Sequence, residues 1–350
     1  MSMASLNPAP KRLFARVGQI DKVVLAFFVI VAGLALFVPG QAVDSLAFTG
    51  LSLWSIAPFF LISIGVAAYA KATGLDEQIA RVFSGNPTTA VILAAGFGAL
   101  SPFCSCGVIP LIAGLLKAGV PLAPVMAFWI ASPLMDPEMF VLTSAVMGVD
   151  FALARTVAAI ALGLGAGFAT QLLMARPTFA DPLVPGLKAT GCGCGSKPVL
   201  RNAEVTWAFW KHDDRRATFG GEFRSAGWFL FRWLTLAFMI ESLMITYIPA
   251  DVVAQTLGGS EWWIVPAAAL VGVPTYLNGY AAIPMVNGLL EMGMSLQAGL
   301  TFMIAGGVSS IPAAMAVFAL VRRPVFAWYL ALGFSGAVLA GYGYQLVLGM

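Results

Sequence analysis

Apolar residues occupy most positions of this chain, in runs long enough to form helices that cross a membrane. A hydrocarbon core of about 30 Å requires about 20 apolar residues in helical conformation. Two long runs, 120–149 and 295–321, are interrupted by Pro, Gly or Ser. The other long runs are uninterrupted: 22–40, 47–71, 151–174, 225–248 and 326–347. The pattern predicts an all-α polytopic membrane protein with about seven full spans.

Two further apolar regions, 88–118 and 262–292, do not fit a straight span. Each has two arms of roughly a dozen residues on either side of a tip, at 101–107 and 274–280. A helical arm of that length is about 18 Å long, so one arm is too short to cross the hydrocarbon core and two arms together are longer than the core is thick. We expect two re-entrant helical hairpins, whose irregular backbone must be buried in protein or line a cavity.

An internal repeat relates the two hairpins. The motif P-x3-G-L-L-K-x-G begins at Pro110, and P-x3-G-L-L-E-x-G begins at Pro284, an offset of 174. The same offset brings the break at Ser132 onto Gly306. Lys117 of the first copy becomes Glu291 in the second, as expected if the copies have opposite orientations. The sequence therefore predicts an inverted structural repeat.

The predicted organisation has four parts. Residues 1–46 form a cytoplasmic N-tail plus an extra transmembrane helix, and 47–174 form the first repeat with hairpin 88–118. Residues 175–223 form a cytoplasmic linker. Residues 224–350 form the second, inverted repeat with hairpin 262–292.

Composition and charge narrow the class of protein. Hydrophobic residues make up 60% of the chain and charged residues 10%, against about 25% charged in soluble proteins, which excludes a soluble enzyme. The net charge of +3 predicts no nucleic-acid partner. With the N-terminus inside, every Lys and Arg except Arg155 and Arg232 faces the cytoplasm. We expect a multi-pass protein of a bacterial-type inner (plasma) membrane.

The cysteines form two Cys-x-Cys pairs. Cys104 and Cys106 lie at the first hairpin tip between Pro and Gly, where thiolates suit a soft metal or metalloid. Packing is the alternative role for these two side chains. Cys192 and Cys194 lie in the linker, where they either deliver or sense a soft metal or belong to an idle flexible loop.

The second hairpin tip and the helix breaks add polar candidates. The second tip offers an amide and two phenolic hydroxyls, and the amide of Asn278 is equally suited to cap the following helix arm. Polar groups at the break of 120–149 lie where broken helices of transporters bind solutes. The predicted substrate-binding set is Cys104, Ser105, Cys106, Ser132, Asp136, Tyr276, Asn278 and Tyr280.

Three ionisable residues inside apolar runs are candidates for ion coupling, since charges are costly in a membrane. Glu241 lies in run 225–248, Glu138 at the break of 120–149, and Arg155 near the start of run 151–174. Arg155 and Glu241 are both expected near the outer side, so a structural ion pair between them is an alternative. Alternatively, Asp136 and Glu138 cap or flank the helix break.

The run FCSCGVIPLIAGLLKAGVPLAPVMAFWIASPLMDPEM, residues 103–139, resembles the YraQ-like predicted-permease family. That family includes the ArsP exporters of trivalent organoarsenicals and permeases assigned to copper or zinc efflux. The resemblance covers 47–174 and 225–347 and implies that Cys104 and Cys106 are the thiols that bind the substrate. Relatives often carry a cysteine in the second tip, where this chain has Leu277, Asn278 and Gly279.

The sequence thus predicts a secondary-transporter-like permease rather than an enzyme. We expect efflux of a thiophilic metal, metalloid or related small solute through a site between the two hairpins, because inverted repeats with broken helices are typical of such transporters. The alternatives are uptake of a small sulfur-containing solute, a membrane thiol-redox protein, and a passive channel. No cofactor is expected, and no nucleotide-binding loop is present in the sequence.

Overall fold

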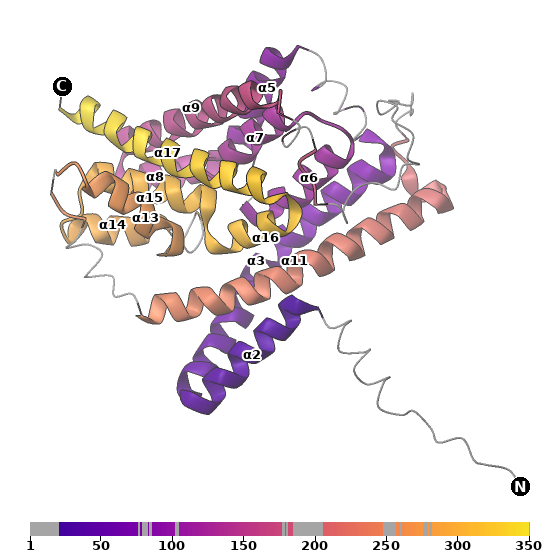
Figure 1. The fold of residues 1–350 in the computed structure, drawn as a ribbon, viewed down its shortest axis with the longest axis horizontal. Coiled ribbons are helices and arrows are strands. Elements are labelled where there is room, and N and C mark those ends of the chain that lie inside the picture. Colours follow the sequence, from indigo (N-terminus) through magenta and orange to yellow (C-terminus); the bar gives the residue numbers. More distant parts are fainter. Residues whose placement is uncertain are drawn as a thin grey trace, which may run out of the picture.

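A computed structural model describes most of the chain and shows an all-helical protein. The described residues are 21–75, 78, 83, 86–101, 105–176, 179, 181–184, 206–247, 257–259, 261–275, 279 and 282–349. Across these residues the ordered elements are helices, and extended pairing is limited to two isolated bridges, Leu183 with Val321 and Gly258 with Met294. The helices form an elongated bundle, with the C-terminus at one end (Figure 1).

Two long helices form one side of the bundle. α3 (Pro39–Thr73) and α11 (Asp213–Tyr247) each have 35 residues and pack along one another, and α2 (Lys22–Phe37) packs on both (Figure 1). Only Val38 separates α2 from α3, because a proline at the first helical position starts a new helix readily. α3 bends by 50° between Pro58 and Phe60, where the ring of Pro58 interrupts the helical hydrogen bonds.

The remaining α-helices of the described residues form two groups of five, and a short 3-10 helix, η2 (Phe209–Lys211), precedes α11. The first group is α5 (Pro87–Leu100), α6 (Ser105–Lys117), α7 (Leu122–Ala131), α8 (Pro137–Met147) and α9 (Val149–Leu173). The second group is α13 (Ile264–Thr275), α14 (Ala282–Glu291), α15 (Leu296–Ser309), α16 (Ile311–Leu320) and α17 (Arg323–Leu348). An offset of 174 residues places each helix of the first group within a few residues of its counterpart in the second.

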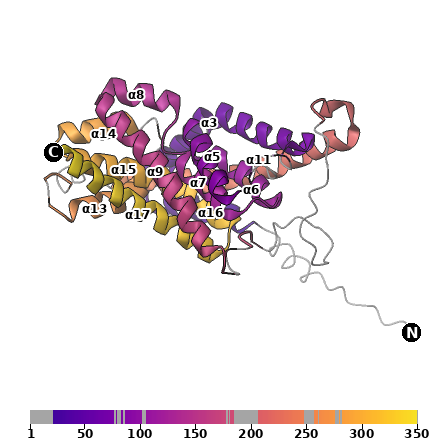
Figure 2. The same cartoon turned by 90° about the horizontal axis from the view of Figure 1, so that it is seen from above.

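Helix packing is also the same in both groups. α5, α7 and α9 pack on one another, and so do α13, α15 and α17. α6 touches α7 as α14 touches α15. Contacts between the groups are reciprocal as well, since α6 packs on α16 while α8 packs on α14; Figure 2 shows the two groups from above.

Two glycines at equivalent positions allow a close approach of helix backbones in both groups. A Cβ on Gly98 would lie 2.8 Å from the carbonyl oxygen of Phe128, and one on Gly272 would lie 2.6 Å from that of Phe302. Both distances are too short for a side chain, so only glycine lets α5 reach α7 and α13 reach α15. Gly98 and Gly272 differ by 174 residues, as do Phe128 and Phe302.

The described ends of the linker contact neighbouring helices. After α9, Asp181 pairs with Arg322 at 2.8 Å between α16 and α17. Before α11, the backbone of Thr206 bonds Thr73 at 3.2 Å, and Arg215 of α11 donates to the carbonyl of Ala72 at 2.9 Å. The two described ends of the linker are thus held by α3 and by the junction of α16 and α17.

Fewer helices than predicted have the length of a full span among the described residues. Val149–Leu173, Asp213–Leu243, Leu296–Leu320 and Arg323–Val347 are long and apolar enough, and the bent α3 makes a fifth. α2, expected as span 22–40, has 16 residues and is about 24 Å long. The interrupted run 120–149 is divided between the shorter α7 and α8. A count of seven spans stays a prediction.

Candidate functional site

The hairpin tips singled out in the sequence lie largely outside the described residues. Cys104, Tyr276, Asn278 and Tyr280 are outside them, as are Cys192 and Cys194 of the linker. Ser105 and Cys106 form the start of α6, and their side chains are not among those described. The geometry around the first tip is therefore built from the helices that surround it.

The break of run 120–149 is a buried turn with a carboxylate at its end. α7 ends at Ala131, Ser132 is its C-cap, and Leu134 bonds back to Ala131 at 3.2 Å. Asp136 is extended and buried, and its side chain accepts a hydrogen bond of 2.7 Å from the amide of Met139. Asp136 thus caps α8, and Pro137 follows at the first helical position, as expected of a helix start.

The break of run 295–321 lies beside an aromatic pair, Trp129 and Tyr329. Only Ser310 separates α15 from α16. Tyr329 of α17 donates a hydrogen bond to the carbonyl of Val308 near the end of α15, and its ring lies 5.0 Å from that of Trp129 near the end of α7. The C-terminal ends of α7 and α15 therefore meet at Tyr329. No local pattern in the sequence predicts this contact, because isolated aromatic residues are common in apolar helices.

Two buried serine hydroxyl groups lie at or beside the first tip. Ser101, the first residue of the tip, caps the C-terminus of α5, and Ser132 caps α7. Gly98 brings these two helix ends together, since a Cβ there would also lie 3.0 Å from that of Ala131. Neither serine hydroxyl has a hydrogen-bond partner among the described residues, although both oxygens are buried. Buried hydroxyls without partners are suited to contact a solute or water.

Arg155 is fully buried between α9 and α8. It donates to the hydroxyl of Thr143 at 3.2 Å and lies 3.6 Å from the sulfur of Met139. The expected ion pair with Glu241 is not among the ion pairs of the described residues. Glu138 is exposed in the first turn of α8, where its charge complements the helix dipole.

Glu241 continues a buried stripe of α11. Leu230, Leu234 and Ala237 precede it at helical spacing, and all four side chains are buried. The Glu241 Oε2 atom has no hydrogen-bond partner among the described residues. The carboxyl group therefore faces the protein interior, where a charged form is costly unless it is compensated.

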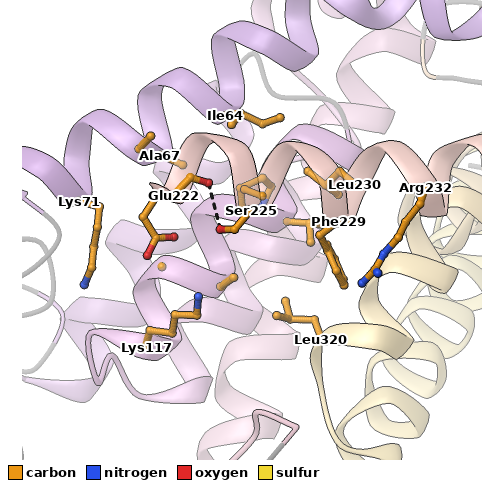
Figure 3. Close-up of a pocket in the computed structure, with 16 residues that line it drawn as sticks. Ile64, Ala67, Lys71, Lys117, Glu222, Ser225, Phe229, Leu230, Arg232 and Leu320 are labelled. Carbon is orange, nitrogen blue, oxygen red and sulfur yellow. Dashed lines mark hydrogen bonds between the residues drawn. The ribbon is translucent and has the colours of Figure 1, made fainter. Parts of the chain in front are cut away.

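A cavity of about 260 Å³ lies between α3, α6, α11 and α16 (Figure 3). Three cations and one carboxylate line it: Lys71, Lys117, Arg232 and Glu222. Arg232 also pairs with Asp21, the N-cap of α2. Sequence reasoning missed this cavity, because its walls come from helices distant in the chain. Arg232 was nevertheless one of two basic residues that the charge pattern left inside a helix.

The part of the chain that the structure covers shows no cluster of metal-binding side chains. No group of three or more His, Cys, Asp or Glu side chains is placed there to hold a metal ion. All four cysteine side chains lie outside that part. A soft-metal site at the first tip accordingly stays a prediction.

Comparison with known proteins agrees with a membrane-embedded permease. The chain is similar to the UPF0718 protein MJ0584 of Methanocaldococcus jannaschii, with 21% identity over 335 residues, 83% of this chain and 90% of the relative. It is similar to the UPF0718 protein YcgR of Bacillus subtilis, with 38% identity over 80 residues, 23% of this chain and 27% of the relative. No solved structure matches.

The family comparison covers nearly the whole described bundle. Residues 41–346 match the family described as predicted permease, ArsP_1, from the start of α3 to the end of α17. Together with several apolar helices of membrane-spanning length, this match identifies a multi-pass membrane protein of the transporter type rather than an enzyme. The chain belongs to the ArsP_1 predicted-permease family.

Proposed function

We propose that this permease is a secondary transporter that exports a thiophilic metal, metalloid or related small solute through a site between hairpin tips 101–107 and 274–280. Cys104 and Cys106 would bind the solute as soft ligands. Ser132 and Asp136 at the break of α7, with Tyr276, Asn278 and Tyr280 at the second tip, would supply polar contacts. The matching halves are the observation that carries the proposal.

The support for matching halves comes from three levels of the molecule. The sequence motif at Pro110 recurs at Pro284, the five helices of each group share one offset, and the tight glycine contacts at Gly98 and Gly272 are equivalent. The exchange of Lys117 for Glu291 fits an inverted arrangement of the two copies. Inverted repeats with discontinuous helices are typical of secondary transporters.

The support for the location of the site comes from the helix ends. α5 and α7 both stop beside the first tip and leave the hydroxyls of Ser101 and Ser132 buried without described partners. α7 and α15 end around Tyr329. Helix ends inside a membrane leave backbone groups that need partners, which a bound solute or water can supply.

Coupling to an ion is proposed through Glu241. It lies buried in α11, one of the helices long enough to cross a membrane. A buried carboxyl group without a described partner for Oε2 is suited to take up and release a proton during a transport cycle. A Glu241→Gln variant should bind solute but lose its response to an imposed proton gradient.

Transport assays on thiol variants test the proposal. Everted membrane vesicles that contain the protein should accumulate arsenite, phenylarsenoxide or Cu(I), with each probe tested separately. The double variant Cys104→Ser, Cys106→Ser should abolish this accumulation and leave the protein folded. Serine is nearly isosteric but is a hard ligand, so affinity for soft ions falls. Cys192→Ser with Cys194→Ser is the matched control and should lower the rate at limiting solute at most. The reverse pattern would contradict the proposal.

The direction of transport and the orientation are tested separately. Right-side-out vesicles that accumulate the same probes would indicate uptake instead of efflux. In a variant without native cysteines, Met350→Cys should react with a membrane-impermeant thiol reagent from outside the cell only. Labelling from the cytoplasm alone would overturn the orientation with the N-terminus inside.

A further inference from the structure

The C-terminal ends of α5 and α7 lie together within the bundle. α5 has 14 residues and α7 has 10, so they are about 21 Å and 15 Å long, and each is too short to cross a hydrocarbon core of about 30 Å. Their last turns touch at Gly98, where an added Cβ would lie 2.8 Å from the carbonyl oxygen of Phe128 and 3.0 Å from the Cβ of Ala131. Both helices therefore end at one place, where their last carbonyl groups need partners.

The turn after α7 leaves two of these carbonyl groups without backbone donors. The carbonyl of Trp129 would normally accept from the amide four residues later, but that residue is Pro133, which has no N–H group. The amide of Leu134 is due to bond Ile130 in a continued helix, and it bonds Ala131 instead, at 3.2 Å. The carbonyls of Trp129 and Ile130 therefore have no backbone donor among the described residues.

Two buried hydroxyl groups belong to the same helix ends. Ser101 is 9% exposed and Ser132 is 2% exposed, and neither hydroxyl has a hydrogen-bond partner among the described residues. The amide of Ser132 bonds the carbonyl of Phe128, the oxygen that also faces Gly98, and the amide of Ser101 bonds the carbonyl of Gly98. A short series of contacts thus joins the two serines, whose hydroxyls need a ligand or water.

The electrostatics of this place favour a small cation. Each helix C-terminus carries about half a negative charge, and two such ends meet here. Asp136 and Arg155 both contact Met139, so one charge of each sign flanks the break. Hydroxyl and carbonyl oxygens are neutral, hard ligands, and divalent ions usually take carboxylates as well, so the donor set suits a monovalent ion. The close contacts around Gly98 leave room only for a small one.

The corresponding helix end in the second half is satisfied within the protein. Pro312 removes the backbone donor of Val308 in the same way, but the hydroxyl of Tyr329 bonds that carbonyl. Ser309 donates to the carbonyl of Ala305 at 2.8 Å. The end of α15 thus uses its hydroxyl groups internally, whereas the ends of α5 and α7 keep theirs for a ligand.

We propose that the ends of α5 and α7 bind a single monovalent cation of the size of Na⁺, held by the hydroxyls of Ser101 and Ser132 and by the carbonyls of Trp129 and Ile130. Unwound carbonyls and half-helix C-termini coordinate Na⁺ in this manner in transporters with broken helices. The ion would fix the backbone that enters the first hairpin tip. A part for the ion in transport rests on the proposed function, whereas binding of the ion does not.

Ion-specific stabilisation of the purified protein tests the proposal without transport. The midpoint of thermal unfolding in detergent is measured in rising NaCl, with choline chloride keeping the ionic strength constant. A ligand that binds only the folded state stabilises it by mass action, so NaCl should raise the midpoint in a saturable manner. KCl should raise the midpoint less. Binding of radioactive Na⁺ to the same protein should saturate at a single ion per chain.

Serine variants locate the ion. Ser101→Ala and Ser132→Ala should each weaken Na⁺ binding about tenfold or more, because each removes an oxygen that contacts a charge. In choline chloride both variants should be at least as stable as the parent protein, since each loses a buried hydroxyl that has no described partner. Ser101→Thr keeps a hydroxyl and should keep the effect of NaCl. Ser309→Ala is the matched control and should bind Na⁺ as the parent protein does.

Four outcomes would overturn the cation site. Equal midpoints in NaCl, KCl and choline chloride would show that no ion is bound specifically, and equal effects of NaCl and KCl would reject an ion of the size of Na⁺. Equal destabilisation of Ser101→Ala and Ser132→Ala in both NaCl and choline chloride would show that the hydroxyls hold water. Loss of Na⁺ binding in Ser309→Ala to the same extent would place the ion elsewhere.

The thiol variant separates this proposal from the proposed function. The Cys104→Ser, Cys106→Ser protein should still bind Na⁺, because neither thiol belongs to the cation site. Specific Na⁺ binding in a protein that exports none of the thiophilic probes would leave the cation site standing and reject the proposed function. Export that depends on the thiols, in a protein without specific Na⁺ binding, would reject the cation site alone.

Discussion

The two halves of the bundle share a backbone arrangement but differ in the chemistry of equivalent positions. Arg155 of α9 donates a hydrogen bond to Thr143 of α8. Its equivalent in the second half is Tyr329 of α17, which donates a hydrogen bond to the Val308 carbonyl of α15. Asp136 caps α8 with its carboxylate, whereas Ser310 at the start of α16 makes no side-chain cap. Packing is repeated between the halves, and the polar groups are not.

This difference indicates which features the fold requires. Residues that let helices approach, such as Gly98 and Gly272 with their phenylalanine partners, are identical in both halves. Charged groups differ between the halves: Lys117 is replaced by Glu291, and Arg322 and Arg323 of the second half stand where the first half has Gly148 and Val149. A scaffold that tolerates such changes leaves each half free to carry a different part of the function.

The largest effect is expected at the equivalent glycines. Gly98→Ala and Gly272→Ala would each force a Cβ against a phenylalanine carbonyl, at 2.8 Å and 2.6 Å. Overpacking of this kind costs about 2–3 kcal/mol, since the opposing atom is backbone and cannot rotate away. Unfolding in detergent, followed by circular dichroism, measures both changes.

Gly96→Ala is the matched control, because a Cβ at Gly96 meets nothing within 4 Å. It should leave the free energy of unfolding unchanged or slightly higher. If Gly98→Ala were severe and Gly272→Ala harmless, the two halves would not be equivalent in packing, and the proposed inverted repeat would lose its main support.

The two helix breaks should respond differently to loss of their cap residues. Asp136→Ala removes the acceptor for the Met139 amide and should destabilise the protein by about 1–2 kcal/mol. Ser310→Ala removes no side-chain cap and should change stability by less than about 0.5 kcal/mol. Thermal unfolding of the two purified variants measures the difference.

Asp136→Asn separates the cap from the charge. Asparagine caps helices as well as aspartate, so stability should be retained. A fall in transport with unchanged stability would support a role of the carboxylate in solute binding. Equal stability loss in Asp136→Asn and Asp136→Ala would show that the charge itself holds the break.

Substitution of Tyr329 tests the contact between the helix breaks that follow α7 and α15. Tyr329→Phe keeps the ring against Trp129 but leaves the Val308 carbonyl without its donor, which should cost about 1 kcal/mol. Tyr342→Phe is the control, because its hydroxyl bonds the Trp262 carbonyl at an exposed position. Equal effects of the two changes on the unfolding temperature would argue against a special bridge at Tyr329.

Much of the helical architecture could be predicted from the sequence, because its signals are local. The short arms around 101–107, the break near Ser132 and the break near Ser310 all follow from Pro, Gly and Ser in apolar runs. α11 begins at Asp213, earlier than the predicted apolar run 225–248. Its first turns are polar and resemble a linker in the sequence, and the helix is recognised only from its packing beside α3.

The candidate site was only partly predictable, because its parts meet through long-range packing. Asp136 was recognised as a cap candidate from its place before Pro137. The contact of Trp129 with Tyr329 joins residues 200 positions apart, and no local pattern marks it. The cavity between α3, α6, α11 and α16 depends in the same way on long-range packing, and no local pattern marks it.

The smallest expected effect concerns Gly114 and Gly288, which are equivalent positions near the ends of α6 and α14. A Cβ at either position meets nothing within 4 Å, so Gly114→Ala and Gly288→Ala should each raise the free energy of unfolding by about 0.5–1 kcal/mol. Thermal unfolding of the two purified variants measures the increases, which should be equal because both positions have the same open surroundings. A loss of stability in Gly114→Ala alone would mean that the two halves differ in packing at this face of α6.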